Sequence, residues 1–208
     1  MEMVEQEARV PVFAHLEGIC HIFVDKSADK QKSLDVCLNA KMRRPGICGA
    51  VETILVHSDI ANEFLPSLIN ALNAQACEIR GCHKVKLLNE NIVEANEEDW
   101  STEYLSLKIS VKKVKNVEDA VEHINKYGTS HTEAIISNNK KNTKYFFENV
   151  KSSILIHNSS TQFADGAELG FGGEVGISTN KLPPRGPVGL NQLVSYKYEV
   201  IGNGQIRS

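Results

Sequence analysis

One cysteine stands in a setting that could carry out covalent chemistry. Cys48 lies between Pro45-Gly46 and Gly49-Ala50, small and turn-forming residues that allow a ligand to approach the backbone closely. A thiol in such a turn can be exposed at the mouth of a cleft, with its own N–H group and that of Gly49 available to stabilise an oxyanion. The pattern indicates a cysteine nucleophile, and a structural cysteine in a turn is the alternative that stays open.

Two arginines come directly before this turn. Arg43 and Arg44 place positive charge near Cys48, and such charge would favour the thiolate over the thiol. A free cysteine with a pKa of about 8.5 is only a few per cent ionised at neutral pH, so this help would matter. The same guanidinium groups could bind an anionic substrate through paired hydrogen bonds.

The other cysteines and His131 are weaker candidates. Cys20 and Cys37 lie in apolar strand and helix patterns, which predict core positions. Cys77 and Cys82-His83 offer sulfur and imidazole, but no second cysteine stands at the spacing of a zinc site, so no metal is predicted. His131, in a loop between a predicted helix and strand, is either a polar site residue or a solvated loop histidine.

A glycine-rich segment invites comparison with dinucleotide-binding loops. Residues 170–176 read Gly-Phe-Gly-Gly-Glu-Val-Gly, a spacing that departs from G-x-G-x-x-G and that opens no clear helix after a strand. We expect a turn-rich loop packed beside an active site instead.

Alternating strands and helices must position these residues, because the apolar spacing switches repeatedly between about 2 and about 3.6 residues. The expected strands cover residues 10–13, 19–25, 53–57, 105–111, 133–137, 153–157 and 193–201. The expected helices cover residues 28–41 after a Ser27 cap, 60–76 after an Asp59 cap, 117–127 between an Asn116 cap and Gly128, and 143–150. The acidic stretch 94–99 should be exposed. Repeated strand–helix–strand units predict an α/β fold with a largely parallel sheet flanked by helices.

Composition narrows the class of protein. The 208 residues are 41% hydrophobic and 24% charged, as in an ordinary globular protein. A net charge of −3 with scattered lysines argues against a nucleic-acid surface. No apolar run approaches the roughly 20 residues of a membrane span. The N-terminus lacks the features of a secretion signal, and five cysteines without repeated spacing suggest reduced thiols, so a cytoplasmic location is expected.

Longer stretches, in order along nearly the whole chain, carry a resemblance to a known family. They are Gly18–Asp25, Asn39–Cys48 with Glu52-Thr53, the positions from Val114 to Ile135 that include His131-Thr132-Glu133, Asp165-Gly166, Phe171-Gly172, Glu174–Thr179 and Arg185–Leu190. The chain resembles gamma-glutamyl phosphate reductase, a branch of the aldehyde dehydrogenase superfamily. The stretch around His131-Thr132-Glu133 is the most specific signature.

The resemblance implies an aldehyde dehydrogenase-like catalytic domain and a reaction. NADPH would reduce L-glutamyl 5-phosphate to L-glutamate 5-semialdehyde and phosphate, a step of proline biosynthesis. Cys48 matches the family's nucleophile. Its thiolate would displace phosphate to form a thioester, and hydride from the nicotinamide would convert the thioester to a thiohemiacetal that collapses to the aldehyde.

The resemblance also suggests roles for other positions. Glu103 matches the superfamily glutamate that holds the nicotinamide ribose, although an exposed acid before a strand is the alternative. Glu17 lies near the general-base glutamate of hydrolytic aldehyde dehydrogenases, but its offset differs and we interpret it as structural. The residues expected to contact substrate are Arg44, His131, Thr132 and Asn158.

The similarity covers only the C-terminal part of longer reductases. Residues 1–41 would be a remnant of the cofactor-binding domain, 42–180 the catalytic domain, and 181–208 a segment returning to the cofactor and oligomerisation region. Most of the NADPH site is then expected in an absent N-terminal half, and the protein is expected to form homo-oligomers, with no nucleic-acid or membrane partner. One alternative is a catalytically incompetent remnant. Another is an acylating aldehyde dehydrogenase with a different substrate, against which the His131-Thr132-Glu133 signature argues.

Overall fold

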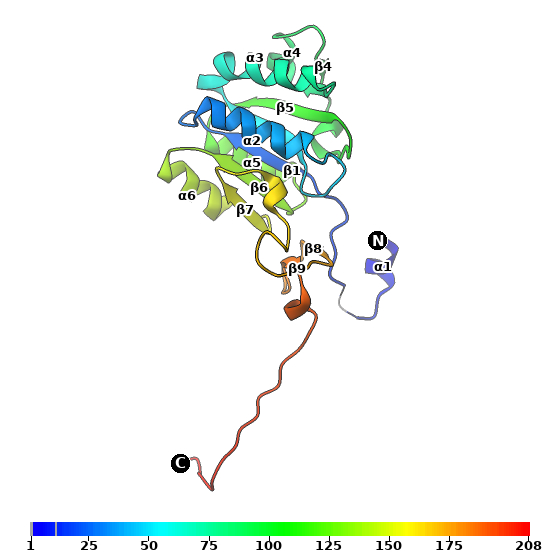
Figure 1. The fold of residues 1–208 in the computed structure, drawn as a ribbon, viewed down its shortest axis with the longest axis vertical. Coiled ribbons are helices and arrows are strands. Elements are labelled where there is room, and N and C mark those ends of the chain that lie inside the picture. Colours follow the sequence, from blue (N-terminus) through cyan, green and yellow to red (C-terminus); the bar gives the residue numbers. More distant parts are fainter. Residues whose placement is uncertain (1, 11) are drawn as a thin grey trace.

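A parallel β-sheet organises the chain. The computed structural model describes residues 2–10 and 12–208 (Figure 1). The sheet has the strand order β4-β3-β5-β2-β1-β6-β7, and every neighbouring pair in it is parallel. Its strands are β1 (Cys20–Val24), β2 (Val51–His57), β3 (Glu78–Gly81), β4 (Val93–Glu94), β5 (Lys108–Val114), β6 (Thr132–Ile136) and β7 (Ile154–His157). The predicted α/β fold with a largely parallel sheet is confirmed.

Helices cover both faces of this sheet (Figure 1). Those packed on the sheet are α2 (Lys30–Met42), α3 (Ser58–Ala74), α4 (His83–Lys86), α5 (Val117–Tyr127) and α6 (Lys140–Asn149), whereas α1 (Glu2–Glu7) lies apart from it. Side chains alternate along a strand, so Ile22 and Val24 of β1 pack with α2 and α3, whereas Phe23 packs with α5 and α6. Two apolar cores result, one on each face, as parallel sheets require.

Three predicted helix starts were wrong, those of α2 and α3 by two residues each and that of α6 by three. Helix α2 is capped by Asp29, whose Oδ1 accepts a hydrogen bond from the Lys32 N–H at 2.8 Å. Ser27 is not the cap, because its hydroxyl donates to Asp25 Oδ2 at 2.6 Å. Helix α3 begins one residue before Asp59, with His57 in the capping position. Short polar side chains close together compete for one cap, and sequence alone does not decide between them.

Helix α5 has the bounds that its sequence predicts, with Asn116 accepting from the Asp119 N–H at its start. Gly128 ends it for a reason other than a left-handed backbone, because its φ is −71°. A Cβ atom there would lie 2.7 Å from the Ile124 carbonyl oxygen and 3.0 Å from Glu133 Oε1. Close approach therefore selects glycine at this position.

The segment 77–102 contains short elements, ending in a 3₁₀ turn at Glu98–Ser101. The predicted exposure of its acidic stretch is wrong for Asp99, which is 9% exposed. The Asp99 carboxylate accepts hydrogen bonds from the Asn96 N–H at 2.8 Å and from the Tyr104 hydroxyl at 2.9 Å. These hydrogen bonds replace those that the carboxylate loses to water when it is buried.

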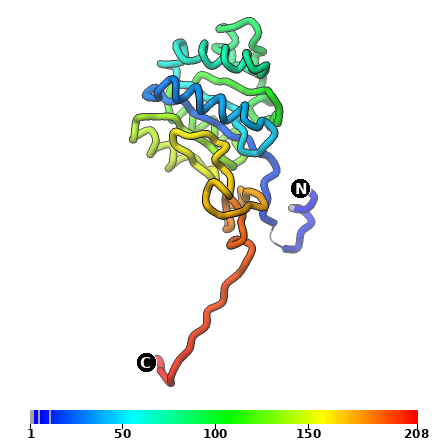
Figure 2. Tube along the Cα trace, in the orientation of Figure 1, coloured from blue at the N-terminus to red at the C-terminus, as the bar shows by residue number. Residues whose placement is uncertain are grey.

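Two predicted strands are absent from the described residues. In the first, 10–13, Pro11 lies outside the described residues and the other positions have no strand partner. The second, 193–201, belongs to an extended segment, 193–208, that leads away from the sheet and is exposed (Figure 2). Apolar alternation predicts a strand, but a strand also needs a neighbour with which to pair.

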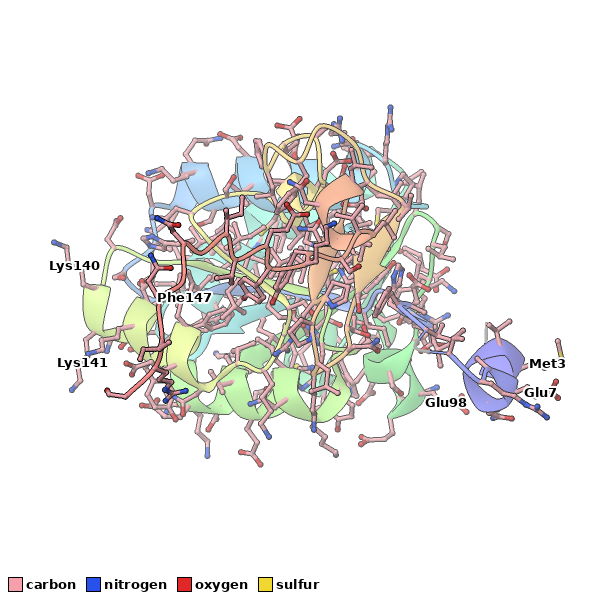
Figure 3. All side chains as sticks on the ribbon, turned by 90° about the horizontal axis from the view of Figure 1, so that it is seen from below. Met3, Glu7, Glu98, Lys140, Lys141 and Phe147 are labelled. Atoms are coloured by element: carbon pink, nitrogen blue, oxygen red, sulfur yellow. The ribbon has the colours of Figure 1, made fainter. Side chains whose placement is uncertain are left out.

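The predicted boundary at residue 41 does not coincide with a break in the fold. Strand β1 lies inside the sheet and pairs with β2 on one side and with β6 on the other. Residues 20–42 therefore belong to the same sheet domain as the strands that follow. Helix α1, by contrast, lies to one side of this domain, with Met3 and Glu7 projecting from it (Figure 3). None of the described helices has the length and apolar composition needed to cross a bilayer.

Candidate active site

Cys48 lies in the tight loop that joins α2 to β2. The loop includes a turn in which the Ala50 N–H donates to the Ile47 carbonyl at 2.9 Å, directly before β2 begins. Gly49 packs against the segment that follows β7, where an added Cβ would lie 3.3 Å from the Thr161 carbonyl oxygen. Cys48 itself is only partly buried. The backbone of the loop is thus fixed while the thiol remains partly accessible.

This loop stands at the edge of the sheet where the central strands begin. Cys20 is the first residue of β1 and lies opposite Val51 of β2, while His131 comes directly before β6. Because neighbouring strands run parallel, their first residues meet at one edge. The register of the sheet therefore brings together residues that are far apart in sequence.

Cys20 supports the Cys48 loop from below. Its thiol is fully buried, as predicted, and donates to the Cys48 carbonyl oxygen at 3.1 Å. Burial, followed by the charge of Glu133, raises the pKa of Cys20 well above the usual range. Cys20 therefore stays a neutral thiol and positions the loop.

His131 is fully buried, so the interpretation as a solvated loop histidine is wrong. Its Nδ1 lies 2.9 Å from Thr132 Oγ1 and 3.6 Å from Cys20 Sγ. Burial, followed by the charge of His15, lowers the pKa of His131 to about 3, so the imidazole is neutral at physiological pH. Among the described residues, its buried Nε2 has no hydrogen-bond partner.

A second histidine, His15, reaches the same place from the segment before β1. Its ring packs edge-on against His131 with centroids 4.9 Å apart, and its Nδ1 lies 2.8 Å from the Ile177 carbonyl oxygen. The sulfur of Cys48 and one ring nitrogen of each histidine lie within 4.8 Å of one another. The sequence reasoning missed His15, whose only local signal is an imidazole three residues before Gly18.

Two carboxylates complete the surroundings of Cys48. Glu103 Oε1 accepts the Gly18 N–H at 2.9 Å, and Gly18 touches the Cys48 backbone so closely that an added Cβ would lie 2.5 Å from its carbonyl oxygen. Glu174 Oε2 accepts the Gly166 N–H at 2.8 Å. The glycine-rich segment thus forms a turn-rich loop, as expected, and brings Glu174 toward the thiol.

The prediction that arginines favour the thiolate is wrong. Burial raises the pKa of the Cys48 thiol, and the charges of Glu174 and Glu103 raise it further. The N–H groups of Cys48 and Gly49 lower it, but they do not outweigh these causes. Arg43 Nη1 instead donates to Gln162 Oε1 at 3.2 Å, and Arg44 is exposed.

The residues predicted to contact substrate are only partly brought together. Thr132 is buried beside His131, at the same edge as Cys48. Asn158 follows β7 at the opposite edge, where its Oδ1 accepts the Ser137 N–H at 2.9 Å and its Nδ2 donates to the Ser137 carbonyl at 3.1 Å. The geometry therefore does not bring Asn158 to the thiol. Glu17 is exposed.

Replacing Glu174 with glutamine is expected to speed alkylation of Cys48 by iodoacetamide about threefold at pH 8. Loss of a nearby negative charge lowers the thiol pKa, and the thiolate is the reacting species. A glutamine side-chain oxygen can still accept the Gly166 N–H, so the loop should persist. Mass spectrometry of the Cys48 peptide gives the rate. Glu168→Gln, an exposed acid in the same loop, is the control, and equal rates in both variants would contradict the expectation.

Comparison with known proteins identifies relatives along nearly the whole chain. It is 52% identical over 205 residues to gamma-glutamyl phosphate reductase of Bartonella tribocorum and 53% identical over 204 residues to that of Brucella suis. These matches cover 99% and 98% of this chain but 50% and 48% of the relatives. The chain thus spans about half the length of the curated relatives it matches, which confirms the expected partial match. No family model matches.

Solved structures agree. The crystal structure of gamma-glutamyl phosphate reductase from Thermotoga maritima superposes with a TM-score of 0.96 at 47% identity, covering 100% of this chain and 50% of that one. An acetylating aldehyde dehydrogenase from Geobacillus thermoglucosidasius superposes with a TM-score of 0.72 at 14% identity, covering 97% of this chain and 56% of that one, a likeness of fold alone. The expected aldehyde dehydrogenase-like fold is confirmed.

Proposed function

Because this chain is homologous over nearly its whole length to one half of the gamma-glutamyl phosphate reductases, we propose that it carries the catalytic half of such an enzyme. The proposed reaction is the NADPH-dependent reduction of L-glutamyl 5-phosphate to L-glutamate 5-semialdehyde and phosphate, with Cys48 as the nucleophile. The observation that carries the proposal is the setting of Cys48. It is a partly accessible thiol on a rigid loop, surrounded by neutral imidazole and by backbone N–H groups.

The thiol must give up its proton as it attacks the substrate carbonyl. Since its pKa is raised, a neighbouring base has to accept that proton as the sulfur–carbon bond forms. A ring nitrogen of His15 lies within 4.8 Å of Cys48 Sγ, and His15 is less buried than His131, so its imidazole can take this proton and pass it to solvent. Phosphate leaves as the carbonyl reforms, and a thioester to Cys48 remains. The N–H groups of Cys48 and Gly49, which already face the sulfur, can stabilise the oxyanion.

The residues present fit one contact to the cofactor. Glu103 is half-buried beside the thiol. Within the described part of the chain its carboxylate accepts a hydrogen bond at Oε1 alone, from the Gly18 N–H, so Oε2 can accept one from a ribose hydroxyl. When bound, NADPH supplies the hydride that reduces the thioester to a thiohemiacetal. The remainder of its site is proposed to lie in the half of the relatives that this chain does not match. Arg44, which is exposed near the loop, and the His131-Thr132 pair are the proposed contacts to the anionic substrate.

The proposal is tested by measuring NADP⁺ reduction with glutamate semialdehyde and phosphate. The assay uses the chain alone and the chain mixed with the unmatched half of a curated relative. We expect turnover in the mixture that Cys48→Ala abolishes. Cys82→Ala, which removes the other partly buried thiol, is the control and should leave turnover intact. Absence of turnover in both preparations would favour the alternative, a catalytically incompetent remnant.

The substrate is tested separately. A preference for simple aldehydes with coenzyme A over glutamate semialdehyde with phosphate would instead favour the acylating aldehyde dehydrogenase. Homo-oligomer formation and a cytoplasmic location stay predictions.

A further inference from the structure

We propose that His15, Cys48 and His131 form a binding site for a borderline-soft divalent cation, Zn²⁺ above all. A sulfur and two imidazole nitrogens within 4.8 Å of one another form a donor set that zinc prefers. The sequence predicts no metal here, because the three residues are separated by 33 and 83 positions and have no zinc-type spacing. The cation would bind whether or not the chain has the proposed reductase activity. Only the expected inhibition, in which the metal-bound Cys48 cannot attack a substrate, rests on the proposed function.

The hydrogen bonds of His15 prepare its ring for a metal. Its Nδ1 lies 2.8 Å from the Ile177 carbonyl oxygen, which can only accept, so Nδ1 carries the proton. The lone pair of the neutral ring is therefore on Nε2. Histidine ligands in metal sites usually donate their other N–H to a backbone carbonyl in this way, which fixes the tautomer and orients the ring.

The second imidazole offers a buried nitrogen that lacks a partner. The Cys20 thiol donates a hydrogen bond to the Cys48 carbonyl oxygen. Both Cys20 Sγ and Thr132 Oγ1 can therefore accept a hydrogen bond from the N–H at His131 Nδ1. That tautomer leaves the lone pair on Nε2, which is buried and has no hydrogen-bond partner among the described residues. An unpaired buried acceptor is unfavourable, and a cation would satisfy it.

Cys48 supplies the third ligand atom of the proposed site, and two nearby carboxylates supply negative charge. Tetrahedral zinc would place its ligand atoms about 3.3–3.8 Å apart, so the present spread requires a shift of roughly 1 Å. His15 can provide this shift because it lies outside the helices and strands. Glu103 and Glu174 add negative charge that attracts a cation. On binding, the thiol proton passes to solvent and the sulfur becomes a ligand, so it can no longer attack a substrate. Since Cys48 is partly exposed, water can fill the fourth position.

The test uses the whole chain under reducing conditions with Co²⁺ as a spectroscopic substitute for zinc. We expect a thiolate-to-cobalt absorption band that appears with one equivalent of metal and that excess Zn²⁺ removes. Cys48→Ala should abolish the band, and His15→Gln should weaken cobalt binding about tenfold or more. Cys82→Ala and His83→Gln, which remove a partly buried sulfur and the exposed imidazole next to it in the sequence, are matched controls and should leave the band unchanged. A band that survives Cys48→Ala would overturn the proposal.

A second measurement does not depend on spectroscopy. Zn²⁺ should slow the alkylation of Cys48 by iodoacetamide, and a chelator should restore the rate. In His15→Gln the protecting zinc concentration should rise about tenfold or more, while the rate without zinc reports whether the loop is intact. Equal protection in the parent protein and in His15→Gln would contradict the site. Neither readout uses turnover, so the site and the proposed function can fail separately.

Discussion

Replacing Gly18 with alanine is expected to lower the rate of any turnover that depends on Cys48 by about 100-fold. The new methyl group would lie 2.5 Å from the Cys48 carbonyl oxygen and 2.9 Å from its Cα and Cβ atoms. All three are atoms of a fixed loop rather than the end of a flexible chain. Either the backbone at position 18 or the Cys48 loop must therefore move by about 1 Å. This movement displaces the thiol or Glu103, which accepts the Gly18 N–H.

Two measurements separate this displacement from general unfolding. The first is the alkylation rate of Cys48, which should change because its distance from Glu103 and from the N–H groups changes. The second is unfolding in urea, in which the variant should still show one cooperative transition. Gly173→Ala is the control, since a Cβ at that position of the glycine-rich loop meets nothing within 4 Å. Full turnover in Gly18→Ala would show that the contact does not set the geometry of the site.

The second large effect concerns a buried ion pair between α2 and β2, the two elements that the Cys48 loop joins. Lys41, at the end of α2, is fully buried, and its Nζ donates to Glu52 Oε2 of β2 at 2.6 Å, while Glu52 Oε1 accepts the Leu105 N–H at 3.3 Å. Replacing Lys41 with methionine would keep the apolar stem and leave the carboxylate without its counter-charge. We expect the free energy of unfolding to fall by about 3–5 kcal/mol at pH 8.

The loss should depend on pH in a defined direction. Burial raises the pKa of Glu52 to about 7 from the usual 4.5, although Lys41 acts to lower it. A carboxyl whose folded-state pKa is raised contributes stability that is complete below its unfolded pKa and that fades as pH rises through about 7. Without Lys41 the pKa rises further, so Glu52 is protonated at pH 5 and needs no counter-charge. The destabilisation by Lys41→Met should therefore be clearly smaller at pH 5 than at pH 8.

Urea unfolding at the two pH values measures this difference. Lys30→Met is the control, because Lys30 pairs with Glu63 on the surface and its loss should change stability by no more than about 1 kcal/mol at either pH. If Lys41→Met destabilised the protein equally at pH 5 and pH 8, burial of the Glu52 charge would not be the cause.

The fold was largely predictable from local patterns. Apolar stretches such as 19–25 and 133–137 gave the central strands, and the cap and stop of the helix 117–127 are local features. The prediction of a strand at 193–201 was wrong, because alternating apolar and polar residues show only that one face of a strand could be buried. Whether another strand is available to pair with it depends on the rest of the structure, which a local pattern does not contain.

The site was less predictable for a related reason. The turn residues around Cys48 pointed to a reactive thiol, but the sign of its pKa shift depends on neighbours that only folding supplies. Arg43 is five residues away in sequence and pairs with Gln162 instead, whereas Glu174 is 126 residues away and its charge raises the pKa of the thiol. His15 was missed because its role arises from the shared edge of a parallel sheet. Side chains at such an edge are neighbours through strand register, not through spacing.

The exposed segment 193–208 changes how the whole molecule moves in water. Fully extended, it reaches up to roughly 50 Å beyond the sheet domain while adding little mass (Figure 2). The frictional coefficient of a particle depends on its dimensions and shape rather than on its mass. A monomer of 23.0 kDa should therefore sediment slowly for its mass and elute early from a gel-filtration column. Elution volume alone would then overstate the number of subunits.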